Sequence, residues 1–208
     1  MRITCVVVGE GSTEVYIQSV ARALVTRYNP NVSLEFKPGE GIHFSNPPGS
    51  LAAKVQNAVD LSAPNLILVH RDSDSNNKQQ ILARFAEVED ACSGIFSASV
   101  PVVPVKETEA WMLADKSAIL EVVGRDALPT AANEIYPKSP ETVQAKERLH
   151  EIFRLCRLES EWKPARINTN EDHRQIRTVV RDLGRLESLP SFRVFKEKMQ
   201  HVLDTLTA

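Results

Sequence analysis

Short apolar runs alternate with segments of helical periodicity along the first 123 residues. Four runs rich in β-branched side chains have the length of buried strands, at residues 3–8, 32–36, 66–70 and 99–105. Apolar residues at helical spacing follow them, at 15–25, 51–61, 79–92 and 109–114. This alternation predicts an α/β fold of Rossmann-like type, with a mostly parallel sheet and helices on both faces.

The second part of the chain has a different pattern. Residues 124–140 are rich in Pro, Ala and Asn, which indicates a loop or a boundary. Beyond them every periodic segment is helical, at 141–158, 173–186 and 192–206. We therefore expect an α/β domain over residues 1–123 and a helical subdomain over 124–208 that packs on it. Pro101 and Pro104 make the run at 99–105 an edge or bulged strand.

Composition indicates an ordinary soluble protein. Of the 208 residues, 42% are hydrophobic and 25% charged. No apolar run approaches the ~20 residues of a membrane span, and the first residues are typical of a strand rather than a secretory leader, so we expect a cytoplasmic protein. Cys5, Cys92 and Cys156 lie far apart in apolar segments, which predicts reduced core residues rather than zinc ligands.

The charge is distributed unevenly. Residues 1–135 carry 11 Lys and Arg against 16 Asp and Glu, whereas residues 136–208 carry 14 against 11. The net charge of −2 disfavours a free-standing, high-affinity nucleic-acid binder. A cationic stripe recurs at helical spacing in the basic region, formed by Arg174, Arg177, Arg181 and Arg185. A solvated helix face is the simpler interpretation of this stripe, and contact with nucleic-acid phosphates is the alternative.

Two carboxylates, Asp72 and Asp74, follow the buried run at 66–70. Ligands of open α/β sheets bind at the carboxyl ends of strands, where these two side chains are expected. Neighbouring carboxylates repel each other unless a cation lies between them, and Mg²⁺ prefers oxygen ligands. The pattern therefore predicts a Mg²⁺ or Mn²⁺ site, although Asp, Ser and Asn are also common in surface turns.

Acids also follow two other predicted strands. The turn Gly9-Glu10-Gly11-Ser12-Thr13-Glu14 lacks the third glycine of a dinucleotide fingerprint and the lysine of a phosphate loop. We expect Ser12 to cap the following helix and Glu14 to lie in its first turn. Glu107 and Glu109 follow the run at 99–105. Because parallel strands end at one edge of the sheet, Glu10, Asp72, Asp74 and, less firmly, Glu107 are candidate ligands of one metal. Capped turns and solvated acids remain the alternative.

These residues carry a family resemblance. The segment at 7–14 resembles the first motif of the TOPRIM superfamily, in which a hydrophobic strand runs into Glu-Gly. Residues 68–74 resemble its Asp-x-Asp motif. Together with 105–115 and a late Ser191-Phe192, they are similar to an uncharacterised bacterial TOPRIM-like family of unknown function, whose members often appear beside ATPases in defence-type operons. The resemblance to TOPRIM itself covers residues 1 to about 110.

The resemblance implies a four-stranded Rossmann-like sheet with a Mg²⁺ site, as in topoisomerases, primases and the nucleases of the overcoming-lysogenization-defect type. Glu10 would lie near the scissile phosphate, and Asp72 and Asp74 would hold the metal. Glu14 would be a less secure ligand of a second metal. The chain has no recognisable topoisomerase module and is too short for a primase with its accessory parts.

We therefore expect a Mg²⁺-dependent nuclease or phosphodiesterase that acts on DNA or RNA with an ATPase partner. Arg71 or Lys106 would stabilise developing charge, and His70 is a weaker candidate for a base because a histidine in a strand usually packs in the core. One alternative is a non-catalytic interaction subunit that keeps the TOPRIM-like fold and binds an ATPase through its helical tail. A less favoured alternative is a phosphotransfer enzyme that uses the turn at 9–12 as an anion cradle.

Overall fold

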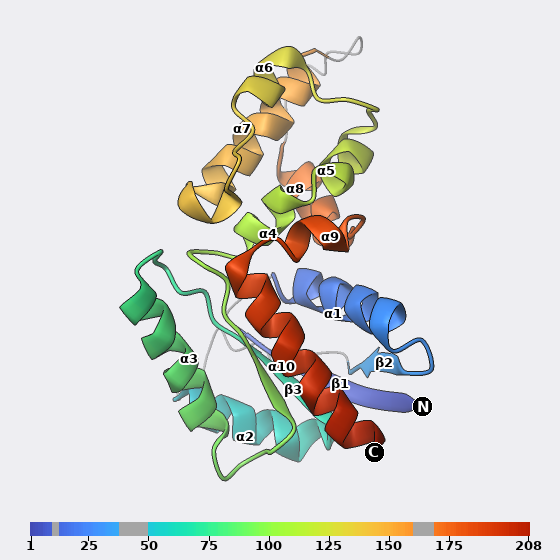
Figure 1. The fold of residues 1–208 in the computed structure, drawn as a ribbon, viewed down its shortest axis with the longest axis vertical. Coiled ribbons are helices and arrows are strands. Elements are labelled where there is room, and N and C mark those ends of the chain that lie inside the picture. Colours follow the sequence, from blue (N-terminus) through green and yellow to red (C-terminus); the bar gives the residue numbers. More distant parts are fainter. Residues whose placement is uncertain (10–12, 38–49, 160–168) are drawn as a thin grey trace.

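A parallel sheet forms the centre of the lower half of the molecule in Figure 1, a computed structural model that describes residues 1–9, 13–37, 50–159 and 169–208. Its strands are β1 (Arg2–Val8), β2 (Ser33–Phe36), β3 (Leu66–His70) and β4 (Ser99–Val102). They are hydrogen-bonded in the order β2-β1-β3-β4, and every pair is parallel. The predicted α/β class with a parallel sheet is confirmed.

Each face of the sheet is covered by helices because both sets of strand side chains are apolar. In β1, Cys5 and Val7 face a core shared with α1 (Glu14–Tyr28) and α10 (Pro190–Thr207). Val6 and Val8 face the opposite core, which α2 (Leu51–Ser62) and α3 (Lys78–Cys92) cover. This burial on both sides explains why the strand sequences are continuous apolar runs rather than alternating ones.

The remaining described helices gather above the sheet in Figure 1. They are α4 (Glu109–Ala114), α5 (Lys116–Val123), α6 (Thr130–Glu134), the 3₁₀ turn η1 (Pro140–Thr142), α7 (Ala145–Leu158), α8 (Thr169–Ile176) and α9 (Leu183–Leu186). One hydrophobic cluster runs without interruption from α1 and the sheet through α4 into α7 and α8. The tail packs on the sheet through α10, which lies against β4. The division between residues 123 and 124 stays a prediction.

Trp111 joins three segments that are distant in the sequence. Its indole Nε1–H donates to Oγ of Ser191 at the start of α10, over 2.7 Å. The Ser191 hydroxyl in turn donates to the Glu141 carboxylate in η1. Phe192 and Phe195 of α10 pack their rings against the indole, with centroids 5.0 and 5.6 Å away. These contacts fix the position of α4, whose first residue adjoins the edge of the sheet.

The predicted helix over residues 173–186 is wrong in its middle. Helix α8 ends at Ile176 and α9 begins only at Leu183. Between them, the backbone N–H groups of Arg181 and Asp182 donate to Oδ2 of the buried Asp115, at 2.7 and 3.0 Å. The β-branched residues Thr178, Val179 and Val180 lower the helix propensity of this segment. The hydrogen bonds to Asp115 then hold its backbone in a non-helical conformation. Helix α6 was also not expected, because residues 124–140 were predicted to be a loop or a boundary.

Strand β4 is an edge of the sheet, as its prolines predicted, but it ends at Val102 rather than Val105. The carbonyls of Ala98 and Val102 accept hydrogen bonds from β3 and the residue after it. Since alternate residues direct their backbone groups to opposite sides, Pro101 faces the open side of the strand and its missing N–H costs the sheet nothing.

The three cysteines are free thiols buried in the core, as predicted. Burial raises the pKa of each thiol, most strongly that of Cys5, so these side chains behave as apolar residues. A helix of sufficient length and apolarity to cross a membrane is absent from the described residues.

Candidate active site at the carboxyl edge of the sheet

We call the region at the carboxyl ends of β1 and β3 the crevice. It lies where the direction of the sheet's winding changes. The chain passes from β1 outward to β2 and then crosses to β3 on the other side of β1. Helix α1, which follows β1, covers one face of the sheet, and α3, which follows β3, covers the other, so the chain leaves the two strands toward opposite faces at this point. Ligands of open α/β sheets bind at such a switch point. Gly9 follows β1 there, and Asp72 follows β3.

A three-residue hydrogen-bond cluster closes one side of the crevice. Oδ1 of Asp72 accepts the backbone N–H of Thr108 at 2.9 Å and lies 3.0 Å from the Thr108 hydroxyl. That hydroxyl lies 2.7 Å from Nε2 of His70, which is itself 3.1 Å from Asp72 Oδ1. All contacts are satisfied if Nε2–H donates to the hydroxyl and the hydroxyl donates to the carboxylate. Thr108 and His70 therefore fix the orientation of Asp72.

The other side of the same imidazole faces the loop after β1. A methyl group on Gly9 would lie 3.0 Å from Cγ and 3.1 Å from Oε1 of Glu14, and 3.4 Å from Nδ1 of His70. The glycine therefore leaves room for Glu14 and His70 to approach the same point. Nδ1 is buried and receives no hydrogen bond from the residues that the structure describes. With Nε2 protonated, Nδ1 presents a lone pair on the same side as the Glu14 carboxylate, an arrangement that a positive charge would stabilise.

Glu109 is a buried acid beside this cluster that the sequence analysis did not include in the metal set. It opens helix α4 and is 6% exposed. Burial raises the pKa of its carboxyl, and the carboxylates of Glu107 and Asp72 raise it further. Its signal in the sequence was the short apolar helix that follows it, Ala110–Ala114, which is buried along its whole length and forces the first residue against the sheet edge.

Asp74 has different partners from Asp72. Its backbone has a φ of +54°, its side chain is 78% exposed, and Oδ2 lies 3.3 Å from the guanidinium of Arg84 in α3. Arg84 also pairs with Glu87 at 2.6 Å, and Glu87 lies 3.5 Å from Arg71. Asp74, Arg84 and Glu87 line a hollow of about 500 Å³ beside the loop. The hollow provides space for a ligand next to the crevice, with charges of both signs in its wall.

Lys106 and Glu107 connect the sheet edge to the helical part. The Lys106 ammonium donates to the carbonyls of Thr142 and Val143, at 3.3 and 3.2 Å. Oε1 of Glu107 accepts the backbone N–H of Lys146 at 2.7 Å and so caps the start of α7. Both side chains have structural partners in the helical part of the chain.

Ser73 holds the loops after β3 and β4 together. Its buried hydroxyl donates to the carbonyl of Ser75 at 2.7 Å and accepts the backbone N–H of Lys106 at 2.8 Å. The N–H of Asp74 donates to the carbonyl of Lys106 over 2.9 Å. Lys106 has a φ of +61°, which this close pairing requires. The loop that carries Asp72 is therefore fixed on both sides.

The four arginines of the predicted stripe do not form one surface, because the helix that would align them is interrupted. Arg174 pairs with Glu171 and Arg181 with Glu121. Arg177 is half-buried, and its Nε has no hydrogen-bond partner. Arg185 lies in α9 and lines a separate pocket. Their role in nucleic-acid binding stays a prediction.

Glu10 and Ser12 lie outside the described residues, and Thr13 occupies the N-cap position of α1. Within the parts of the chain that the structure describes, no three His, Cys, Asp or Glu side chains are close enough together to hold a metal ion. The predicted metal ligands that are described thus separate into Glu14 and Asp72, which both adjoin His70, and Asp74 and Glu107, which have partners elsewhere.

Comparison of this chain with family models, with curated proteins and with solved structures finds no match. The function therefore has to be argued from the residues themselves.

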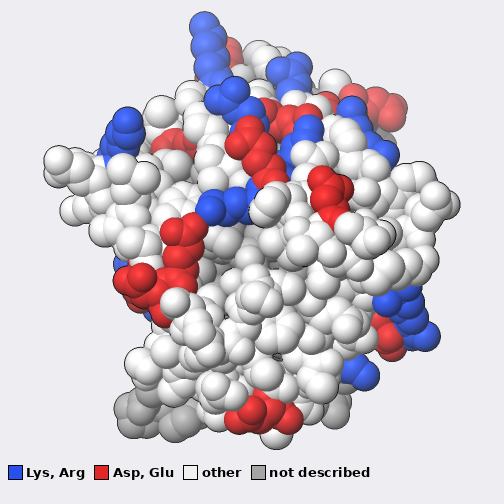
Figure 2. All heavy atoms as spheres, turned by 60° about the horizontal axis from the view of Figure 1, so that its bottom comes forward, with Lys and Arg blue, Asp and Glu red and all other residues white. Residues whose placement is uncertain are grey.

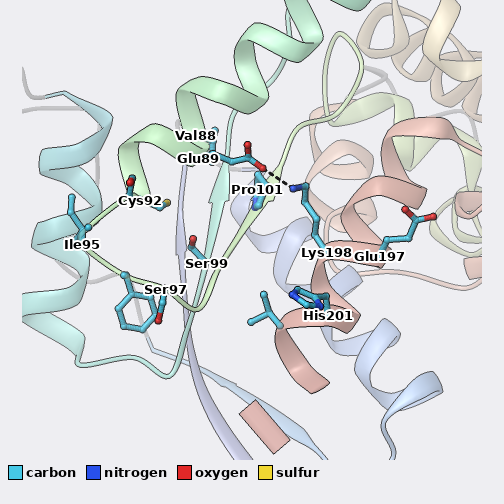
Figure 3. A pocket seen from close by; sticks show the side chains of 14 residues that line it. Val88, Glu89, Cys92, Ile95, Ser97, Ser99, Pro101, Glu197, Lys198 and His201 are labelled. Carbon is cyan, nitrogen blue, oxygen red and sulfur yellow. Dashed lines mark hydrogen bonds and ion pairs between the residues drawn. The ribbon is translucent and has the colours of Figure 1, made fainter. Parts of the chain in front are cut away.

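A groove of about 800 Å³ lies away from this edge, between α3, β4 and α10 (Figure 3). Glu89 and Lys198 form an ion pair of 2.7 Å across it, and Pro101, Ser99 and His201 lie on its walls. Its lining brings no group of acids together and it adjoins the start of β4 rather than its end. The groove is therefore not the candidate active site.

Proposed function

We propose that the crevice between β1 and β3 binds Mg²⁺ or Mn²⁺ and that the chain is a metal-dependent phosphodiesterase acting on nucleic acid. The observation that supports this most is the position of Asp72 at the switch point of a parallel sheet, where Thr108 and His70 hold its carboxylate in one orientation. The TOPRIM resemblance, which rests on the motifs at 7–14 and 68–74, assigns metal-binding acids to the same loops.

The oxygen donors at this edge are of the kind that a hard cation binds, and because no three of them meet within the described residues, the site would need Glu10 to complete it. Glu14 and Asp72 supply carboxylate oxygens, and Glu109 adds a buried carboxyl whose raised pKa a nearby cation would lower. Glu10 follows Gly9 directly and is proposed as a further ligand. When bound, such a cation neutralises the phosphate and lowers the pKa of a coordinated water.

The chain's own residues then have distinct roles. Thr108 and His70 hold the Asp72 carboxylate in one orientation, so that it is placed before the ligand arrives. Arg71 is half-buried beside the hollow that Asp74 lines and supplies a cation for charge that develops on the phosphate. Lys106, which the sequence suggested for the same task, is assigned to positioning because its ammonium contacts main-chain carbonyls.

Cleavage assays test this proposal. The purified chain is incubated with plasmid, single-stranded DNA and RNA in Mg²⁺ or Mn²⁺, and Asp72→Asn, Glu14→Gln and Glu10→Gln are compared with Asp204→Asn, an exposed acid of α10. We expect the crevice variants to lose cleavage and Asp204→Asn to retain it. Unchanged cleavage by Asp72→Asn would refute the assignment.

A second function is favoured by the partners of Asp74 and Glu107, which are bound to Arg84 and to the start of α7. In this alternative the chain is a non-catalytic subunit that binds an ATPase through its helical tail. Calorimetric titration with Mg²⁺ separates the two functions without requiring the ATPase. Micromolar binding that Asp72→Asn abolishes supports the enzyme, and binding that is absent or unaffected by Asp72→Asn and Asp74→Asn supports the interaction subunit.

A further inference from the structure

A pocket of about 400 Å³ in the helical part has a wall that contains basic residues and no acidic ones. It lies between the end of α4, the start of α5, the segment after α6 and the turn after α9. Its lining consists of Ala114, Lys116, Asn133, Tyr136, Pro137, Lys138, Pro140, Arg185 and Ser188. Three segments that are distant in the sequence thus each contribute one cation.

The cations of this pocket differ from the other arginines of the tail. Arg174 and Arg181 each pair with a carboxylate, whereas no Asp or Glu among the described residues forms an ion pair with Lys116, Lys138 or Arg185. Lys116 instead donates to Oδ1 of Asn133 at 2.9 Å and lies 5.3 Å above the Tyr136 ring. The positive charge of the pocket is therefore not neutralised by a neighbouring side chain.

The nearest acids are already bound to other groups. Asp115 is fully buried, and its oxygens accept backbone N–H groups from Ala118, Arg181 and Asp182. Asp182 caps α9 by accepting the N–H of Arg185. Glu187 pairs with Lys196 on the other side of α9. None of these three acids lines the pocket, so a negatively charged ligand would not meet a carboxylate at its wall.

We propose that this pocket binds a backbone phosphate of a nucleic-acid strand. Arg185 presents a planar fork that matches phosphate oxygens, and the lysines act as point charges on either side. The amide of Asn133 accepts from Lys116 through its oxygen, which leaves its NH₂ group as a neutral donor to the same ligand. Tyr136 is the one aromatic residue of the lining, and Lys116 covers its ring. The pocket therefore suits a phosphate better than a stacked base.

The position of the pocket relative to the crevice favours a polymer as the source of the phosphate. Helix α4 begins at Glu109 beside Asp72 and ends at Ala114 in the pocket wall. Five helical steps span about 7.5 Å. In a straight line, the two ends of α4 are therefore about two nucleotide steps apart for a strand that rises about 3.4 Å per residue. Because α4 itself is buried, a strand held in the crevice would reach the pocket over the residues that cover α4. The inference rests on the proposed function for the source of the phosphate.

Positive and negative side chains are mixed on the face of the molecule drawn in Figure 2. On the face drawn there, Lys and Arg are interspersed with Asp and Glu around a broad uncharged centre, and no continuous basic band is visible. Binding of a strand at the pocket would depend on its three cations, and removal of one of them should have a measurable effect.

The test is equilibrium binding of a short, fluorescently labelled oligonucleotide to the full chain in EDTA, followed by anisotropy. Lys138→Gln and Arg185→Gln are compared with Arg154→Gln, which removes the same charge from a paired, exposed arginine of α7. We expect each pocket variant to weaken binding about tenfold at low salt and to reduce the slope of log K against log salt by about 1. Arg154→Gln should leave both quantities unchanged.

Equal affinity in wild type and both pocket variants, or an equal loss in Arg154→Gln, refutes the proposal. Competition with inorganic phosphate and with a mononucleotide identifies the source. Binding of these small anions at the pocket without binding of the oligonucleotide also refutes it, since the pocket would then hold free phosphate. Because the assay contains EDTA and measures no cleavage, its failure is distinct from a failure of the metal-dependent activity, which Asp72→Asn tests.

Discussion

The Asp72 carboxylate, which follows β3, accepts hydrogen bonds from both the backbone N–H and the hydroxyl of Thr108, which follows β4. The loop after β3 and the loop after β4 are thereby joined at the carboxyl edge of the sheet. His70, 2% exposed, completes the cluster from within β3. The proposed metal ligand is thus held by residues that have no acidic character and that a search for carboxylates would pass over.

Thr108→Val should reduce stability and weaken cation binding together. The substitution keeps the branched shape but leaves Asp72 and His70 without the hydroxyl between them, in a buried site. We expect the free energy of unfolding to fall by about 1–3 kcal/mol, measured by denaturant titration. Thr178→Val, which removes an exposed hydroxyl, should change it by less than about 0.5 kcal/mol. Equal effects of the two substitutions would contradict the cluster.

Gly9→Ala should impair cation binding more than it impairs folding. The added methyl group would push the end of the Glu14 side chain, which moves at low cost, away from His70. We expect kcat/KM for cleavage to fall about 10- to 100-fold, and calorimetry should show weaker Mg²⁺ binding. The control is Gly94→Ala, at a glycine with a φ of +73° and open space around it. That variant should lose about 1–2 kcal/mol of stability through backbone strain and bind Mg²⁺ normally.

Ser191→Ala should destabilise the junction of α4, η1 and α10. Trp111 and Glu141 would each lose a buried hydrogen-bond partner, and we expect the free energy of unfolding to fall by about 2 kcal/mol. Burial raises the pKa of the Glu141 carboxyl, and the bonds from Ser191 oppose that rise. A folded-state pKa above the unfolded value favours the native state at low pH, and this contribution is lost as the pH rises through the folded pKa.

The destabilisation by Ser191→Ala should therefore be larger at about pH 8 than at about pH 5, because the carboxylate is then charged and keeps only the backbone N–H of residue 191 of its two donors there. Denaturant titrations at both values measure it. Ser188→Ala is the matched control, since its exposed hydroxyl donates only to the carbonyl of Arg185. If Ser191→Ala lowered the free energy of unfolding equally at both pH values, the serine hydroxyl would not stabilise the charged form of Glu141.

His173 should make the protein less stable in mild acid. Burial, together with the smaller effects of His150, Arg177 and Lys146, lowers the pKa of its imidazole to about 4. The unfolded chain takes up this proton near pH 6.5, so the free energy of unfolding is highest above that value and falls as the pH drops toward 4. The loss amounts to about 3 kcal/mol at most.

His173→Phe should flatten this part of the pH profile, because the stacked position against His150 is retained without a titrating group. The quantity to compare is the difference in the free energy of unfolding between variant and wild type across pH 4–7. This difference removes the contribution of carboxylates common to both proteins. His201→Asn, at an exposed position in α10, should leave the profile unchanged. A wild-type profile that is flat over this range, or a variant that keeps the slope, would contradict the assignment.

Sequence periodicity predicted the parts of the fold that depend on local pattern. Strands β1 and β3 were identified because each is apolar on both faces, and β4 was expected at an edge or a bulge because a proline cannot donate to a ladder. The position of Asp72 at the carboxyl edge follows from the same pattern, since an acid directly after a buried strand must emerge there. The order of the strands required the structure.

The partners of the acids depend on long-range contacts that no local pattern contains. Glu107 and Glu109 are two residues apart, yet one caps α7 and the other is buried beside Asp72. The break after α8 depends on Asp115, a residue 66 positions before Arg181 in the sequence. His70 was considered as a packed strand residue or a base, and the structure shows the packed position with Nε2 bound to the cluster.

Pro101 also affects how this protein meets copies of itself. An exposed strand edge is a template for pairing with another chain, and such pairing leads to aggregation. A strand laid along β4 would find no donor at Pro101, and it would have to enter a groove that the ion pair of Glu89 and Lys198 crosses. Self-association by sheet extension is therefore disfavoured on this side, and replacing Pro101 with a β-branched residue would be expected to increase aggregation at high protein concentration.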